Sequence, residues 1–188
     1  PAAAHDGHML PSALPVVQAP MAGGPSTPAL AAAVADAGGF PFVAGGYLPA
    51  GGLRTAITAT RDLTSAPFGV NLFVPSHPGD RAEIARYTDS LRPEAERLGV
   101  APGEPRHDDD HYAAKIDVVT AERPHLVSFT FGCPGPDVVE RLHASGSLVA
   151  VTVTSVADAA LAQDAGADLL QAQGPEAGGH QGGCDDTE

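Results

Sequence analysis

The sequence predicts an α/β protein built around a parallel β-sheet. Apolar runs recur along the 188 residues, are nearly continuous rather than alternating, and are separated by helical stretches. Continuous apolar runs are typical of parallel strands covered on both faces, and strand–helix repeats with short loops indicate right-handed βαβ crossovers. About five and a half such repeats fit the chain, which suits a doubly wound sheet or the first two-thirds of a (β/α)8 barrel.

The predicted elements alternate along the chain, apart from a longer polar stretch between the third and fourth strands. This stretch has a helical pattern over 79–100, with a break at Pro93, and carries a second helix within 103–124. The remaining elements are strands at 15–20, 40–46, 67–75, 126–132, 148–155 and 167–173, and helices at 25–38, 53–63, 136–146 and 156–166.

Local signals mark several element boundaries. Ser26 or Thr27 can cap the first helix, and one of the carboxylates in Asp108–Asp110 can cap the helix that follows the polar stretch. Because proline cannot donate to a sheet ladder, Pro41 predicts a late or distorted start for the second strand.

Composition excludes several classes of partner. The net charge is −13 and Lys115 is the only lysine, so the surface repels nucleic acids and anionic membranes. No apolar run approaches the length of a membrane span, and no signal peptide is evident, so a cytoplasmic location is predicted. The two cysteines do not make a disulfide framework, which agrees with a reducing compartment. A phosphate-bearing ligand would need backbone N–H groups rather than a basic patch.

Polar and Gly-rich residues follow several predicted strands at the same end. In a doubly wound sheet and in a barrel alike, the loops after the strands form the functional face. The loop QGPEAGGHQGG (173–183) stands out there. Its glycines allow backbone to approach a ligand closely, and they surround His180, a residue type that titrates near neutral pH.

Five ordered motifs together resemble the nitronate monooxygenase family, formerly called 2-nitropropane dioxygenases. The resemblance covers most of residues 15–183 and implies a TIM (β/α)8 barrel, of which this chain holds about the first six strands. It also implies FMN as cofactor and oxidation of alkyl nitronates (deprotonated nitroalkanes) with O2 to a carbonyl compound and nitrite. The motifs are VVQAPMAGG (16–24), AAAVADAGGF (31–40), PFGVNLFVP (67–75), VSFTFGCP (127–134) and QGPEAGGHQGG (173–183).

The resemblance also assigns roles to individual residues. His180 matches the catalytic histidine of the family, as a base for the proton α to the nitro group or as an anchor for the nitronate anion. Gln181 departs from the family, because a basic residue is frequent at that position. The matched FMN contacts are Ala19, Pro20 and Met21 along the flavin ring, Asn71 in the third strand, and Gln173, Gly178 and Gly179 around the last loop.

The resemblance sets expectations for domain organisation. Residues 1–12 are expected to be a disordered extension, and residues 13–188 the N-terminal part of one FMN-binding barrel domain. Family members have a further stretch with strands seven and eight, whose loops commonly form the phosphate site of a barrel. An open part-barrel exposes strand edges, so the chain alone is expected to be poorly stable, aggregation-prone or a homo-oligomer.

Three alternative functions stay open. A flavin-dependent enoyl-ACP reductase shares the EAGGH-type loop and would need a nicotinamide cofactor. A barrel fragment without independent catalysis is the second alternative. A non-flavin barrel enzyme that uses His180 on a phosphorylated metabolite is a distant third.

Other candidate residues are given structural roles. HDDDH (107–111) places two histidines one helical turn apart, but a solvated helix start is favoured over a metal site, and no metal is predicted. Cys133 is expected to be a small buried residue rather than a nucleophile. Glu176 could orient the His180 ring or cap the loop, and Tyr47 could line the substrate pocket.

Overall fold

A computed structural model describes residues 10–183, whose central feature is a five-stranded parallel sheet. Each strand pairs with the next one along the chain, in the order β1 to β5. A doubly wound sheet needs a reversal of this order, so the sheet is instead an arc of a barrel. The strands are β1 (Phe42–Ala44), β2 (Gly69–Phe73), β3 (Leu126–Thr130), β4 (Leu148–Val153) and β5 (Leu169–Ala172).

The first predicted strand, at 15–20, is wrong as a regular strand. The segment makes a single parallel bridge, between Val17 and Phe40. Two backbone hydrogen bonds hold it beside β1: the Gln18 N–H donates to the Phe40 carbonyl at 3.0 Å, and the Phe40 N–H donates to the Val16 carbonyl at 2.9 Å. Prolines at positions 15 and 20 cannot donate to a ladder, which limits the pairing to this short stretch.

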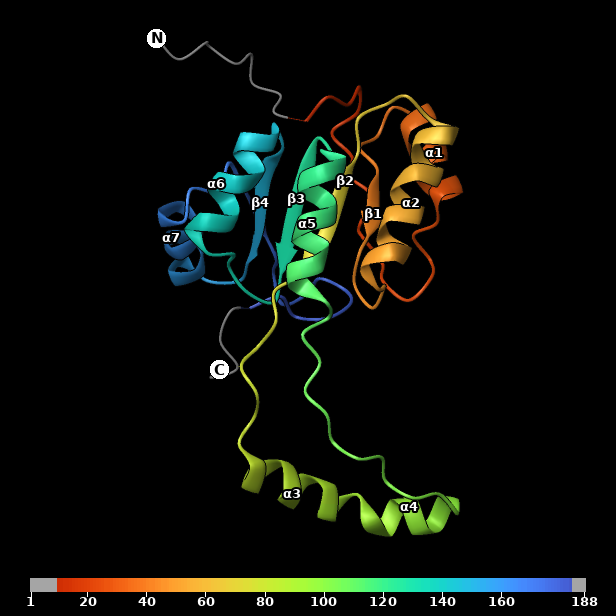
Figure 1. Cartoon of the computed structure of the whole chain (residues 1–188), viewed down its shortest axis with the longest axis vertical. Helices are drawn as coiled ribbons and strands as arrows, with labels where there is room; N and C mark the ends of the chain where they lie inside the picture. Colours follow the sequence, from red (N-terminus) through yellow and green to blue (C-terminus); the bar gives the residue numbers. More distant parts are fainter. Residues whose placement is uncertain (1–9, 184–188) are drawn as a thin grey trace.

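Helices cover one face of the sheet. Figure 1 shows α2, α5 and α6 in front of the strands. Among residues 10–183, no helix is long and apolar enough to cross a membrane. The helices of this layer are α1 (Pro28–Asp36), α2 (Ala50–Leu63), α5 (Tyr112–Glu122), α6 (Pro136–Ser145) and α7 (Val156–Asp164).

Two helix starts illustrate the capping signals. The Thr27 hydroxyl accepts a hydrogen bond from the Leu30 N–H at 3.1 Å, so Thr27 rather than Ser26 caps α1. Ser155 and Asp158 form a reciprocal capping box at the start of α7. As expected, β1 begins only after Pro41.

The core lies on both faces of the sheet. On the helix-covered face, side chains such as Val70, Phe129 and Val149 pack against Leu53 and Leu142 of α2 and α6. Alternate strand positions point to the inner face of the arc, because side chains alternate along a strand. A second cluster contains Phe40, Phe42, Leu126 and Ala150, and Leu10 from the end of the predicted extension packs on it. Residues 1–9 lie outside the described part of the chain.

The predicted polar stretch forms a helical arm between β2 and α5. Two helices make up the arm, α3 (Arg81–Ser90) and α4 (Arg92–Leu98). The break falls at Leu91, and Pro93 lies in the first turn of α4, where a missing N–H costs nothing. Figure 1 shows the arm apart from the sheet, and Tyr87 on it is 67% exposed.

Both outer positions of the arc leave apolar side chains exposed. Val16 beside β1 is 55% exposed, and Leu170 of β5 is 47% exposed. Exposed apolar strand edges are templates for pairing with another chain. The expectation that the chain alone associates or aggregates therefore stays a prediction.

Candidate active site

A cleft of about 1100 Å³ opens at the carboxyl ends of β2 and β3. The predicted functional face and this cleft therefore coincide. The two segments that connect the arm to the sheet both line this cleft, the first through His77 and the second through Asp108 and Asp110. Gln181 and Gly183 bring in the Gly-rich loop.

The inner face of the sheet becomes polar toward this end. Asn71 is only 3% exposed, and its Nδ2 donates to the Ser128 hydroxyl at 2.9 Å and to the Thr130 hydroxyl at 3.0 Å. Among the described residues, no donor bonds the Asn71 Oδ1. Amide oxygens of buried residues normally have a partner, so this acceptor is available to a ligand.

The segment after the first bridge is closed into a tight loop by Ser26. The Ser26 hydroxyl accepts from the Met21 N–H at 2.8 Å and from the Gln18 amide at 3.0 Å. The Gln18 side chain also bonds the Phe42 N–H and carbonyl, at 3.3 and 3.2 Å, which ties the loop to β1. Met21 stays 40% exposed and Ala19 is also exposed, so this backbone is accessible to a ligand.

Gln173 organises the Gly-rich loop. Its Nε2 donates to the His180 carbonyl at 2.9 Å, and its Oε1 accepts from the Gly182 N–H at 2.6 Å. A Cβ at Gly182 would lie 2.8 Å from the Thr152 side chain, so only glycine fits there. The loop is therefore held at His180 itself and at Gly182.

The glycines before His180 remain open. A Cβ at Gly178 or at Gly179 would meet no atom within 4 Å, and Gly179 has a φ of +85°. Within residues 10–183, the N–H groups of Gly178, Gly179 and His180 have no acceptor. Three free amides in one loop can donate to an anionic or carbonyl-rich ligand.

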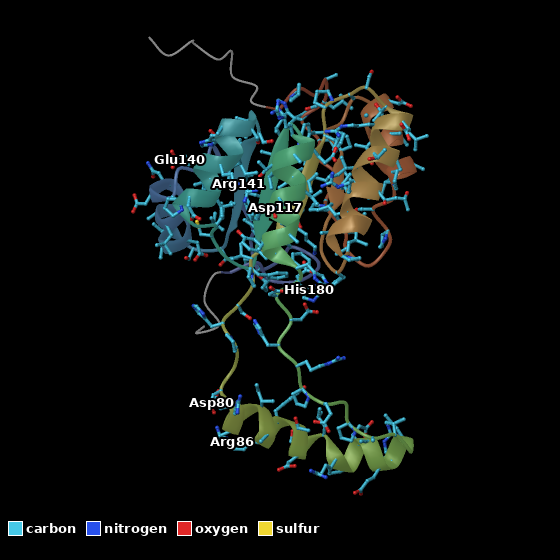
Figure 2. All side chains as sticks on the ribbon, in the orientation of Figure 1. Asp80, Arg86, Asp117, Glu140, Arg141 and His180 are labelled. Carbon is cyan, nitrogen blue, oxygen red and sulfur yellow. The ribbon has the colours of Figure 1, made fainter. Side chains whose placement is uncertain are left out.

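A row of aromatic rings leads to His180. The Tyr47 and Phe73 rings are 5.4 Å apart, those of Phe73 and Phe131 are 4.9 Å apart, and those of Phe131 and His180 are 5.9 Å apart, all edge to face. Figure 2 shows His180 at the margin of the barrel body that faces the arm. The His180 side chain is exposed and makes no hydrogen bond to another described side chain.

Sequence reasoning missed two of these rings, Phe73 and Phe131. Phe73 ends β2 and Phe131 directly follows β3, where the sequence does not distinguish them from core residues. Phe131 has a φ of +67°, and Tyr47 a φ of +63°. Such backbone is costly for a non-glycine residue and is concentrated at functional sites, but it leaves no mark in a single sequence.

The prediction that an Asp of Asp108–Asp110 caps the next helix is wrong. The helix α5 starts after His111, whose side chain makes no capping bond. Asp108 and Asp109 instead accept from the N–H groups of Asp110 and His111, at 2.8 and 3.0 Å. The Asp110 carboxylate turns toward Lys115, with its Oδ2 2.7 Å from the Lys115 Nζ. Within residues 10–183, no three His, Cys, Asp or Glu side chains are grouped to hold a metal ion.

Cys133 is half-buried rather than fully buried as expected, and this burial raises the pKa of its thiol above its ordinary value. The thiol therefore stays protonated at neutral pH, and we expect iodoacetamide to alkylate Cys133 more slowly than a free cysteine peptide. The rate should climb about tenfold per pH unit as the thiolate fraction increases. Mass spectrometry of the Cys133 peptide measures this separately from Cys184, which lies outside the described residues. Fast alkylation of Cys133 at pH 7 would instead identify an activated thiolate.

Comparisons with known proteins agree with this geometry. The family model described as nitronate monooxygenase matches residues 9–188. A nitronate monooxygenase of Paraburkholderia phytofirmans is 41% identical over 177 residues, covering 89% of this chain and 47% of the relative. One from Pseudomonas aeruginosa is 43% identical over 176 residues, covering 89% of this chain and 49% of the relative.

Solved structures of related enzymes superimpose on this chain. Nitroalkane oxidase from Streptomyces ansochromogenes superimposes with a TM-score of 0.87 at 44% identity, over 94% of this chain and 51% of that one. A mutant of FabK from Thermotoga maritima superimposes with a TM-score of 0.69 at 28% identity, over 92% of this chain and 46% of that one. The chain thus spans about half the length of the relatives it matches. From its motifs, its barrel arc and these likenesses, the chain belongs to the nitronate monooxygenase family.

Proposed function

We propose that this chain supplies the FMN-binding and proton-transfer part of an enzyme that oxidises alkyl nitronates with O2 to a carbonyl compound and nitrite. One observation carries the proposal: Gln173 holds a loop that brings an exposed histidine and free glycine amides together at the carboxyl end of the barrel arc. In barrel enzymes this end carries the chemistry.

The residues present fit a flat cofactor such as FMN. Ala19, Pro20 and Met21 offer accessible backbone beside β1, and the Asn71 Oδ1 offers an acceptor without a partner among residues 10–183. Gly178 and Gly179 offer open space and free N–H donors, while Gln173 keeps their loop in place. FMN, when bound, supplies the redox chemistry, while the protein binds and orients the reactants.

His180 is assigned the role of general base. No described side chain bonds its ring nitrogens, so a neutral imidazole has a lone pair free to accept the proton α to a nitro group. The resulting imidazolium then attracts the nitronate anion. The Phe131 ring packs edge to face on the imidazole and limits the orientations of its plane.

Glu176 is left out of this mechanism. Its carboxylate folds back over Gly174, since a Cβ at Gly174 would lie 2.7 Å from the Glu176 Oε2. No hydrogen bond joins it to the His180 ring among the described residues.

Oxygen uptake with nitronates tests the proposed function. The purified chain, supplied with FMN, is assayed for O2 consumption and nitrite release with pre-formed nitronates and with the parent nitroalkanes. We expect both signals to appear together and to need no nicotinamide cofactor. Consumption of NAD(P)H with an enoyl thioester, without nitrite release, would favour the enoyl-ACP reductase alternative instead.

A further inference from the structure

We propose that the buried Asp110–Lys115 pair positions Tyr47 as a wall of the cleft, which selects nitronates with an extended alkyl chain. The inference rests on the proposed function, which it deepens by naming a substrate class and a positioning device. Asp110 and Lys115 belong to no part of the chemistry assigned above. The sequence pattern around Asp110 had indicated only a solvated helix start.

The pair is unusual because of its burial. Lys115 is the only lysine of the chain, yet its side chain is 1% exposed. Its Nζ lies 2.7 Å from the Asp110 Oδ2, and neither atom has another hydrogen-bond partner among the described residues. An ion pair whose two facing charged atoms are buried without further hydrogen bonds contributes little net stability, so fixing a local arrangement is the better reason for it.

The arrangement that it fixes is the backbone of Tyr47. The other carboxylate oxygen, Asp110 Oδ1, accepts a hydrogen bond from the Tyr47 N–H at 2.9 Å. Tyr47 has a φ of +63°, a conformation that a tyrosine keeps only where its surroundings enforce it. Lys115 fixes Asp110, and Asp110 in turn holds the strained peptide at Tyr47.

The ring of Tyr47 lines the cleft. The residue is 66% exposed, its ring lies edge to face on Phe73 at 5.4 Å, and it lines the same cleft as Phe73 and Phe131. Gly46 allows this packing, because a Cβ there would lie 2.2 Å from the Phe73 ring. Three aromatic rings thus form one apolar wall that ends at His180.

Such a wall recognises aliphatic carbon rather than the nitro group. Each methylene of a substrate that packs on an apolar surface contributes about a fourfold increase in kcat/KM. We therefore expect kcat/KM to rise along a series of linear nitronates from two to five carbons. Replacing Tyr47 with Ala should flatten this rise, with a smaller effect on the two-carbon substrate.

Two double variants isolate the contact between Asp110 and Tyr47. Asp110→Asn with Lys115→Met removes both buried charges but keeps an amide oxygen that can accept from the Tyr47 N–H. Asp110→Leu with Lys115→Met removes both charges and the acceptor. Because neither double variant buries a lone charge, both avoid the main penalty that single replacements would incur. Asp109→Asn, on an exposed neighbour, is the matched single control.

Tryptophan fluorescence gives a measurement that needs no substrate, because the chain contains no tryptophan of its own. Tyr47→Trp introduces a single tryptophan at the wall, and the other changes are made in this background. Tryptophan emission and acrylamide quenching are recorded without FMN. We expect the Asn double variant and Asp109→Asn to match the Tyr47→Trp parent, and the Leu double variant to show a red-shifted emission and at least twofold stronger quenching.

The outcomes separate this inference from the proposed function. Identical tryptophan fluorescence in the two double variants would overturn the positioning role of Asp110, whatever the enzyme does. An unchanged chain-length dependence in Tyr47→Ala, in a protein that oxidises nitronates, would overturn the wall. Absence of nitronate oxidation in a parent protein that retains FMN would sink the proposed function, while the fluorescence result would still decide the role of Asp110.

Discussion

Replacing His180 with Asn should lower turnover of neutral nitroalkanes by about 10²- to 10⁴-fold, the usual contribution of a general base. Asn is similar in size but has no lone pair basic enough to take the α-proton. Turnover of pre-formed nitronates should fall much less, because those substrates have already lost the proton. The measurement is O2 consumption with matched nitroalkane and nitronate pairs, each at several concentrations.

His107→Asn provides the matched control for this prediction. His107 is exposed and is not among the residues that line the cleft. We expect its activity to stay within about twofold of the parent, as is usual for an exposed surface substitution. Equal losses on nitroalkane and nitronate in His180→Asn would show that His180 anchors the anion. No loss on either would remove His180 from the site.

Phe129→Ala should be among the most destabilising single changes in the core. The Phe129 ring is fully buried between the sheet and the helix layer, where it packs edge to face on Tyr112 at 6.4 Å. Truncating a buried phenylalanine costs about 3–5 kcal/mol, from lost transfer free energy and the cavity left behind. Urea unfolding followed by circular dichroism measures the change as a lower midpoint.

Tyr87→Ala is the corresponding control on the arm. Tyr87 is 67% exposed, so the same loss of an aromatic ring should change the unfolding free energy by less than about 0.5 kcal/mol. A comparable loss of stability in both variants would mean that the arm packs against the body or against another chain.

The parallel sheet was predictable because β1 to β4 are nearly continuous apolar runs that are buried on both faces, whereas β5 is mostly exposed. β2, β3 and β4 lie within the predicted runs, and the helices between them keep their predicted order. The first strand was not predictable in this way. Val16 and Val17 are apolar, but they lie at the edge of the arc, where exposure and two prolines leave only one bridge.

The Gly-rich loop of the site was predictable from its glycine pattern. The contacts between side chains that are distant in the sequence were not predictable. The loop around His180 was identified from its glycines. The role of Gln173 in holding that loop could not be predicted from the sequence, because it depends on hydrogen bonds to His180 and Gly182 that only the folded loop shows. The Asp110–Lys115 pair was hidden for a different reason. An Asp-rich run at a helix start is normally solvated, and the sequence alone does not show that Asp110 meets the buried Lys115 and the Tyr47 N–H.

The central claim is that the carboxyl end of this barrel arc is a flavin site, and its most direct test is an absorption spectrum. The chain is mixed with FMN, freed of excess cofactor and scanned in the visible range, before and after anaerobic addition of a nitronate. The account predicts a retained flavin spectrum that bleaches with the nitronate. Loss of all flavin from the folded chain under conditions in which a longer family member retains it would contradict the claim, and would assign binding to the part of the barrel beyond these strands.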